Sequence, residues 1–575
     1  MSNVAPAPES EAIASQPAWL RIASHILTAC YLIAAAALLL WGAWKRFQLP
    51  QSPILDPDIE GYLGPAISAL AGKPFLHLVG RSFPYPAFLY VILRIFGDFR
   101  AIAVTQHLLG IAAGALILLA WNAAGALVPA GGIPRPIFRY MGLAPAYIYL
   151  GSATAISFEH QIRPEAIFSF LAILNIWVSF LFLKARFIRV NPSYLWFGAL
   201  NVFISFLIYM AKPSFGFATL FSSLPVWISL VLPGPHVRAN VRAKTALAAF
   251  AILPALLLLF LPEHILKARD PWGALFLPET LLCVHAGIID QQMTEDLAGN
   301  APLPYPRGTV QAAHDLLAAE LAKASQVTTP KSYPTLGFNP DYLMYEDSFC
   351  IRFPRQMHFT NPDMAAFCMT WYLRALRHHP GAMAAKTRGQ LAIFYTGKNP
   401  AFWLGKSLDL SGLQYARVDR LMQLTSQLGP NNPAVARYIA TCDQLAGQGI
   451  AITQARRFVE WLRLFSGIYL DLLAVALLSP VLLGFRPLRA HFLWLVAALL
   501  LVYSYNFFNC LTIAVVHSLE VTRYVRVQLI FTIFAQCLSL YLLLELAAFG
   551  IRLVLARFLP RWAPAPRASV VAPGR

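Results

Sequence analysis

The chain has 575 residues, of which 58% are hydrophobic and only 13% are charged. Soluble domains hold roughly 45–50% apolar and about 25% charged residues, so this composition excludes an ordinary soluble protein and indicates one that crosses a membrane several times. The formal net charge of +18 is expected to come from cytoplasmic loops rich in Lys and Arg, and no nucleic-acid partner is expected.

Ten stretches of the chain are apolar over about the 20 residues that a membrane-spanning helix needs. They cover residues 22–44, 101–128, 138–156, 166–183, 194–210, 215–232, 246–261, 461–483, 492–516 and 527–546. A shorter apolar run, residues 83–96, begins with two prolines and is too short to span, so it is predicted to be a juxtamembrane or re-entrant helix. The expected fold is an α-helical polytopic membrane protein with about 10 transmembrane helices.

Hydropathy falls between the seventh and eighth spans, where Pro, Gly, His and charged residues recur. The predicted organisation is a disordered cytoplasmic tail (1–18), an N-terminal transmembrane module (19–261) with a first outer loop (47–100), a mostly α extracytoplasmic domain (262–457), C-terminal transmembrane helices (458–551) and a basic cytoplasmic tail (552–575). The seven cysteines form no Cys-X-X-Cys pair, which argues against a zinc or thioredoxin-like site. In an oxidising compartment the outside segment would form one or two disulfides, of undecided pairing, from Cys283, Cys350, Cys368 and Cys442.

The distribution of basic residues decides the orientation. With a cytoplasmic N-terminus and no crossing by residues 83–96, every cytoplasmic connection between spans is basic and contains no acid, as the positive-inside rule requires. Lys45 and Arg46 are exceptions, because they fall on the outer side, and Glu9 and Glu11 fall on the inner side. We therefore expect both termini in the cytoplasm and the long polar segment outside.

Under this topology, acids and bases gather at the outer rim of the membrane. Its charged and polar residues are Asp56, Asp58, Glu60, Tyr62, Arg81, Glu159, His160, Arg163, Glu165, Lys212, His517, Glu520, Arg523, Tyr524 and Arg526. The guanidinium group of arginine can donate two parallel hydrogen bonds to phosphate oxygens, and a carboxylate can accept a proton from a nucleophile. Together these residue types suit a lipid-phosphate substrate that approaches from the outer leaflet.

The first outer loop also resembles a known family. Asp-Ile-Glu-Gly-Tyr at 58–62, Ala-Ile-Ser-Ala-Leu-Ala-Gly-Lys-Pro at 66–74, Arg-Ser-Phe-Pro-Tyr-Pro-Ala-Phe-Leu-Tyr at 81–90 and Arg100 resemble that loop in GT-C glycosyltransferases, such as protein O-mannosyltransferases and aminoarabinose lipid A transferases. The resemblance covers residues 20–230, with a weaker similarity at 522–526. Ile59 stands where the family usually has Glu, and Arg81 where it commonly has Lys. Residues 262–457 match no domain of the family, which leaves the acceptor open.

The resemblance implies that a sugar is transferred, with inversion, from a polyprenyl-phosphate donor to an acceptor on the outer face. Asp58, by its spacing to Tyr62, would be the general base, and the supporting acids would be Asp56, Glu60 and Glu159. Fixed cations would stabilise the departing phosphate, namely Arg81, Arg163, Arg523 and Arg526.

Simpler interpretations accompany these assignments. Asp56 would serve equally well as a helix cap, Arg81 as a side chain that reaches lipid headgroups, and Glu159 with Arg163 as a mutual i, i+4 ion pair. The acids would also suit Mg or Mn, but the resemblance implies transfer to hydroxyls without a metal, so neither a metal nor another cofactor is expected.

The expected partners are the lipid-linked sugar, the bilayer, and an acceptor that is a glycan, a lipid or a protein. The expected location is the inner membrane of a bacterium, with the active site on the periplasmic side. Two alternatives stay open: an oligosaccharide ligase or polymerase on the same scaffold, and a transporter of lipid-linked sugars. Asp471, within the eighth predicted span, favours the transporter, whereas hydrogen bonds between helices explain Asn506 and Asn509 in the ninth.

Overall fold

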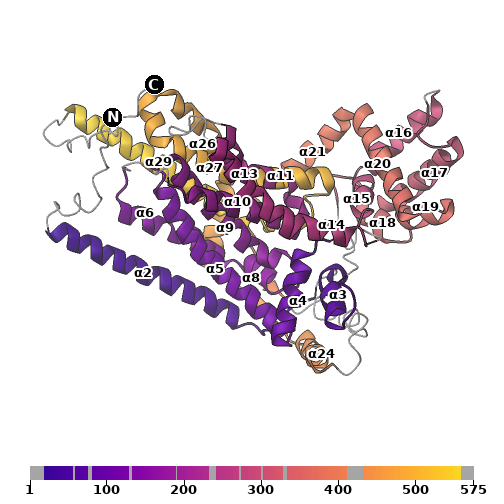
Figure 1. The fold of residues 1–575 in the computed structure, drawn as a ribbon, viewed down its shortest axis with the longest axis horizontal. Coiled ribbons are helices and arrows are strands. Elements are labelled where there is room, and N and C mark those ends of the chain that lie inside the picture. Colours follow the sequence, from indigo (N-terminus) through magenta and orange to yellow (C-terminus); the bar gives the residue numbers. More distant parts are fainter. Residues whose placement is uncertain are drawn as a thin grey trace.

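The computed structural model describes residues 18–55, 58–75, 81–128, 132–188, 191–231, 241–270, 273–299, 302–327, 333–410 and 432–558. These residues are overwhelmingly helical (Figure 1). The described strands, β1 (Ser407–Asp409) and β2 (Ala451–Thr453), form an antiparallel pair in which Leu408 lies opposite Ile452. The predicted roles of Asp56 and of the two terminal tails up to residue 17 and from residue 559 lie outside the described residues.

The chain is an α-helical polytopic membrane protein. Within the described ranges, eight stretches are long and apolar enough to cross a membrane, and one bent helix pair would make a ninth. The helices concerned are α2 (Ala18–Phe47), α5 (Arg100–Gly125), α9 (Glu165–Leu183), α10 (Tyr194–Ala211), α11 (Gly216–Ser222) with α12 (Leu224–Val231), α13 (Val241–Ala255) with α14 (Leu261–Lys267), α27 (Arg486–Val516) and α28 (Thr522–Arg526) with α29 (Leu529–Phe558). The bent pair is α25 (Arg456–Gly467) and α26 (Tyr469–Leu478), which meet at 42°.

The third predicted span, residues 138–156, is not a single helix. It is divided into α6 (Arg135–Met141), α7 (Leu143–Gly151) and α8 (Ala153–Glu159), each too short to cross alone. Gly142 separates α6 from α7. The backbone of Gly142 lies so close to the Trp121 ring that a Cβ at this position would be 2.5 Å from it. Ser152, in an extended conformation, separates the last two, and the neighbouring amide of Ala153 donates instead to the Gln454 side chain at 2.9 Å.

The three short helices nevertheless run the length of α5. At one end the Trp121 indole donates to the carbonyl of Phe138, and at the other the Gln106 amide donates to the carbonyl of Glu159. Gln106 and Trp121 lie about four turns apart in α5, or about 22 Å along its axis. The segment therefore returns antiparallel to α5 across most of the apolar layer. Ten crossings remain a prediction.

The apolar run after the first outer loop forms α4 (Pro84–Phe96), a short helix as predicted. It begins with Pro84, whose missing N–H costs nothing in a first helical turn. It ends at Gly97, whose φ of +61° is a left-handed conformation that glycine adopts without strain. It packs against α3 (Ile59–Leu70) and α5, so it braces the loop that carries the first group of acids.

The first part of α2 and the last part of α29 lie at the same end of the helix bundle, which we call the Glu545 end. The Glu545 carboxylate of α29 accepts hydrogen bonds from the amides of Gly132 and Ile133. At the same end α6 contacts the first turns of α2, where Arg139 donates to the Thr28 hydroxyl. The start of α2 and the end of α29 lie on the left in Figure 1, opposite α15–α20. This placement agrees with two termini on one side of the membrane.

The long polar segment is mostly α, but it divides between two apolar cores. Its helices are α15 (Phe276–Val284), α16 (Ala286–Ala298), α17 (Arg307–Ala324), α18 (Pro340–Tyr345), α19 (Phe349–Met357), α20 (Asn361–His378), α21 (Pro380–Phe394) and α24 (Pro433–Ala446). Residues from Leu275 to Met383 enclose a core of their own around Trp371. In contrast, Phe394, Tyr438 and others join the core of the bundle, so the second half of the segment is not a separate body.

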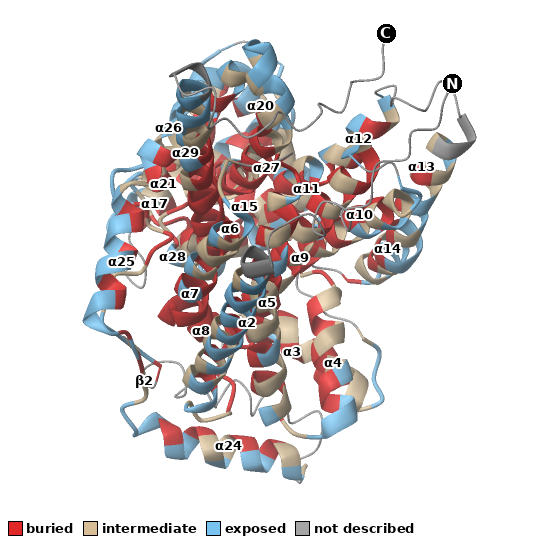
Figure 2. Ribbon diagram, turned by 90° about the vertical axis from the view of Figure 1, so that its left-hand side faces the viewer, coloured by how far each residue is buried: buried red, intermediate tan, exposed pale blue. Residues whose placement is uncertain are grey.

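Burial also separates lipid-facing from protein-facing helices. Figure 2 shows that α2 is largely exposed. Only 17% of the most apolar part of α2 is buried, whereas 78% of the most apolar part of the α9 span is buried. The exposed side chains of α2 include Ile22, Leu32 and Leu40. A row of exposed leucine and isoleucine is costly in water but suits a bilayer.

Candidate functional site

Asp58 lies between two arginines from opposite ends of the sequence. Its carboxylate is 3.2 Å from Nη2 of Arg81 and accepts a 2.9 Å hydrogen bond from Nη1 of Arg523. Arg81 belongs to the first outer loop, and Arg523 belongs to α28. A quarter of the Asp58 side chain remains exposed. The structure thus brings together three residues that were predicted to share a site, at what we call the Asp58 end of the bundle.

The loop before Asp58 is attached to the next outer loop. The amide of Ile54 donates to the carbonyl of His160 at 2.8 Å, and the amide of Ile162 donates to the carbonyl of Ile54 at 2.9 Å. Asp58 then occupies the N-cap position of α3, but its carboxylate makes no capping hydrogen bond. The side chain faces the arginines instead of its own helix, which separates Asp58 from an ordinary capping residue.

The arginines determine the protonation state of Asp58. Burial opposes ionisation, but Arg81, Arg523 and the more distant Arg163 outweigh it and lower the pKa of the carboxyl to about 2. Asp58 is therefore a carboxylate at neutral pH, though a weak base for as long as both arginines hold it. Any anion that took over the two guanidinium groups would raise the pKa and strengthen the base.

A second group of charges adjoins the first. Lys212 donates to Glu165 at 2.7 Å, and Nε of Arg163 is 3.9 Å from the other carboxylate oxygen of Glu165. The Tyr524 ring connects the groups, because Lys212 Nζ and the Arg523 guanidinium each lie 5.1 Å from its centroid. We call this set the charge cluster: Asp58, Arg81, Arg163, Glu165, Lys212 and Arg523. It contains four cations and two carboxylates, so its net charge is positive.

Aromatic side chains hold the Arg81 guanidinium in place. Its central carbon lies 5.3 Å from the Tyr62 ring centroid and 4.9 Å from that of Phe276. Tyr62 packs edge-on against Tyr85, whose hydroxyl donates to Gln106 at 2.8 Å. Stacking of this kind orients an arginine and leaves its N–H groups in one plane for an anion.

The polar segment reaches the site through a residue that the sequence did not single out. Phe276 begins α15. Tyr345 ends α18, where it is exposed, and it lies within electrostatic range of Arg81 and Asp58. Nothing local in the sequence connects either aromatic residue with the first outer loop. Only the docking of α15 and α18 at the Asp58 end brings them there.

Glu159, expected among the supporting acids, lies in a different network. It accepts hydrogen bonds of 2.6 and 2.7 Å from Arg46 and lies 3.2 Å from Nδ1 of His107. The expected i, i+4 ion pair with Arg163 does not form, since Arg163 instead lies beside Glu165. The pairing also explains why Arg46 departs from the predicted positive-inside pattern, because this arginine is fully buried and is not a loop charge of the kind that the rule counts.

The remaining predicted residues take no part in the charge cluster. Glu60 is exposed in the first turn of α3. Arg526, three residues after Arg523, is half-buried and forms no ion pair with a described residue. Asp471 is exposed in the first turn of α26, just after the bend, and so does not line a cavity within the bundle. Asn506 donates to Gln528 and to Thr532 of α29, as expected for bonding between helices. The same expectation is wrong for Asn509, whose buried amide has no hydrogen-bond partner among the described residues.

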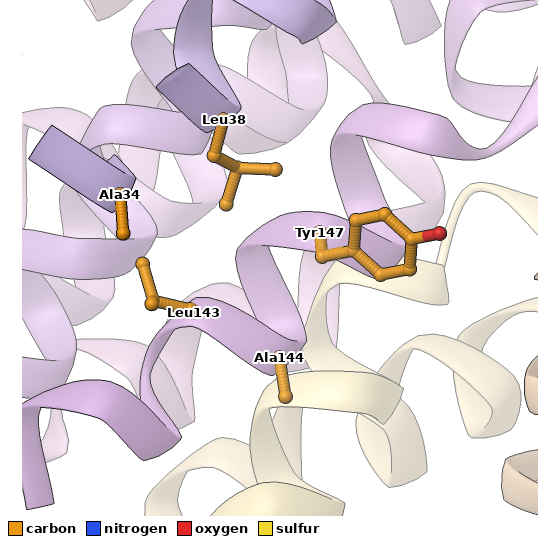
Figure 3. Close-up of a pocket in the computed structure, with 5 residues that line it drawn as sticks. All are labelled: Ala34, Leu38, Leu143, Ala144 and Tyr147. Carbon is orange, nitrogen blue, oxygen red and sulfur yellow. The ribbon is translucent and has the colours of Figure 1, made fainter. Parts of the chain in front are cut away.

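Two further features carry no chemistry. Among the residues that the structure describes, no group of three or more His, Cys, Asp and Glu side chains is arranged to hold a metal ion. A surface hollow of about 330 Å³ between α2 and α7 has no charged residue in its lining (Figure 3). It is lined by Ala34, Leu38, Leu143, Ala144 and Tyr147.

Comparison of the chain with protein-family models, with curated proteins and with solved structures finds no match.

Proposed function

We propose that the chain is an integral membrane glycosyltransferase that moves a sugar from a polyprenyl-phosphate donor to an acceptor at the outer face of a bacterial inner membrane. The observation that supports it most directly is the ionised, partly exposed Asp58 between Arg81 and Arg523. This geometry places a base beside two guanidinium groups. Those are the two elements that displacement of a phosphate by a hydroxyl requires.

The charge balance of the cluster suits a phosphate leaving group. The phosphodiester that joins lipid and sugar carries one negative charge, and the departing phosphomonoester carries more. Arginine donates to phosphate oxygens through a planar pair of N–H groups. Because cations outnumber carboxylates in the charge cluster, it can stabilise the charge that develops as the sugar–phosphate bond breaks.

The same contacts give Asp58 a role that depends on the donor. Before the donor binds, the arginines hold the pKa of Asp58 at about 2. As phosphate oxygens take over N–H groups of Arg81 and Arg523, the carboxylate becomes more basic. It can then accept the proton of an attacking hydroxyl, a contribution of roughly 10²–10⁴ in rate. The base thus becomes effective when the leaving group is in place.

The acceptor would approach past the polar segment. Phe276 of α15 contacts Arg81, and Tyr345 of α18 lies within the field of the same charges. Both belong to the part of the chain for which the family resemblance gives no equivalent. We therefore assign acceptor selection to residues 273–383 and donor binding to the charge cluster.

The test uses the purified full-length protein with polyprenyl-phosphate sugars and a solubilised cell-envelope extract as the source of acceptor. The protein should release polyprenyl phosphate in step with sugar transfer, and Asp58→Asn should lower that rate at least 100-fold while donor binding persists. Glu60→Gln is the matched control, because Glu60 lies two residues away but is exposed. Full activity of Asp58→Asn would refute the base, and absence of release by the unmodified protein would refute the transferase.

A further inference from the structure

Two cysteines of the polar segment lie in contact. Cys283 of α15 and Cys350 of α19 are both buried, and their Sγ atoms are 3.3 Å apart. The third cysteine of this core, Cys368 of α20, is also buried. We propose that Cys283 and Cys350 form a disulfide in the mature protein, and that this bond joins the helix of Phe276, whose ring packs on Arg81, to the helix that follows Tyr345.

The geometry selects this pair. A disulfide requires about 2.05 Å between its sulfur atoms, so the two side chains need to approach by only about 1 Å from where they stand. The pair joins positions 67 residues apart in the chain, so the bond would close a large loop and constrain the unfolded chain strongly. Sequence spacing alone left the pairing of the four cysteines open, and the fold brings Cys283 and Cys350 into contact.

The chemistry of closure is an oxidation by another disulfide. The thiols of Cys283 and Cys350 together give up two protons and two electrons as the sulfur–sulfur bond forms. The electrons pass by thiol–disulfide exchange to the disulfide of a thiol-oxidising protein in the outer compartment, which is reduced to a dithiol. This proposal uses the predicted outside location of the segment and is independent of the transferase reaction.

Burial fixes when the bond forms. It raises the pKa of the Cys283 thiol, and contact with Cys283 together with burial raises that of Cys350. Since the thiolate is the attacking species, the folded, reduced protein would oxidise slowly. The bond therefore forms while the segment is still folding and the thiols are exposed.

The proposed bond connects to the site through two short stretches of helix. Phe276, whose ring packs on Arg81, lies on the same helix as Cys283. Tyr345 lies five residues before Cys350, at the end of α18. Joining α15 to α19 would therefore fix the spacing between the two aromatic side chains. Without the bond, only the apolar core would hold that spacing.

The test uses full-length protein from membranes of cells with an intact thiol-oxidation system. Cysteines are alkylated in denaturant without reductant, and peptides are identified by mass spectrometry. We expect a cross-linked peptide pair that contains Cys283 and Cys350, and alkylation of both only after reduction. Alkylation of both thiols without reductant, or a cross-link from either to Cys368, would overturn the proposal.

A second measurement tests the bracing role. The double variant Cys283→Ser/Cys350→Ser should be cut several-fold faster by protease within residues 273–383, and the same acceleration should follow reduction of the unmodified protein. Cys30→Ser is the control, because Cys30 is exposed on α2, and it should leave the cleavage rate unchanged. Equal cleavage rates with and without the bond would refute the bracing role, even if the bond is found.

Discussion

The buried ion pair between Arg46 and Glu159 allows a quantitative test of the fold. The two side chains are 0% and 2% exposed and share two hydrogen bonds. Replacing Arg46 by Met leaves the Glu159 carboxylate buried without its main partner. Removal of one member of such a pair typically costs about 3–5 kcal/mol of stability. His107, at 3.2 Å from the carboxylate, remains as one partner, so we expect the lower half of that range.

The double variant separates the charge from the shape. In Arg46→Met/Glu159→Gln neither side chain is charged, and replacement of both charges in a buried pair is often nearly neutral. We expect the double variant to unfold within about 1–2 kcal/mol of the unmodified protein, and so to be more stable than either single variant. The coupling energy between the two positions should therefore be large and favourable.

The assay is equilibrium unfolding in mixed micelles, driven by increasing SDS and followed by tryptophan fluorescence. The control pair is Arg456 and Glu460, which lie 3.0 Å apart but are 84% and 52% exposed. Exposed i, i+4 pairs contribute about 0.3–0.5 kcal/mol, so the control cycle should show almost no coupling. Additive effects at Arg46 and Glu159, with the double variant as unstable as the sum, would refute the reasoning.

Three further predictions concern other parts of the molecule. Gly110→Ala should destabilise the protein far more than Gly287→Ala in the same assay, because a Cβ at Gly110 would lie 2.1 Å from the Glu159 carboxylate, whereas at Gly287 it meets nothing within 4 Å. Lys386→Met should lower kcat/KM of the proposed transfer roughly 10-fold or more. The Lys386 side chain donates to the last carbonyls of α27 and so anchors the turn before α28, the helix that carries Arg523. Unchanged kinetics would contradict this anchoring role. Burial raises the pKa of Glu279 to about 8 from 4.5, so between these two pH values the folded protein holds a proton that the unfolded protein has lost. Stability should therefore fall as the pH rises from about 4.5 through 8. Glu279→Gln should make the thermal midpoint depend less on pH over this range.

The membrane spans were predictable because lipid imposes a simple length rule on apolar helices. Nine of the ten predicted spans overlap the eight long helices and the bent pair. The exception, residues 138–156, is interrupted at Gly142, which lies against the Trp121 ring, and at Ser152, after which the Ala153 amide donates to the Gln454 side chain. Such breaks depend on neighbours that a hydropathy window does not contain.

The site was predictable only where its residues are local or stand against the local trend. Asp58 and Arg81 fall in one loop of recognisable order, and Arg523 is a base at the rim predicted to be the outer one, where bases are unusual. Phe276 gave no such signal, because an aromatic residue in a polar segment has many ordinary uses. The partner of Glu159 was missed for a similar reason, since Arg46 lies 113 residues earlier in the chain and looked like a helix-end charge.

Two acids, Asp58 and Glu159, each accept hydrogen bonds from arginine, yet exposure and charge balance assign them different roles. Glu159 is buried, and the single positive charge of Arg46 balances its negative charge. A substrate therefore cannot reach this pair, and the pair has no excess positive charge to bind an anion. Asp58 is a quarter exposed, faces two arginines, and lies in a cluster where cations outnumber carboxylates. A second anion can therefore enter the cluster without leaving it negatively charged. On this reasoning the Arg46 pair stabilises the fold, and the two arginines beside Asp58 are the groups that would bind the phosphate of the proposed donor.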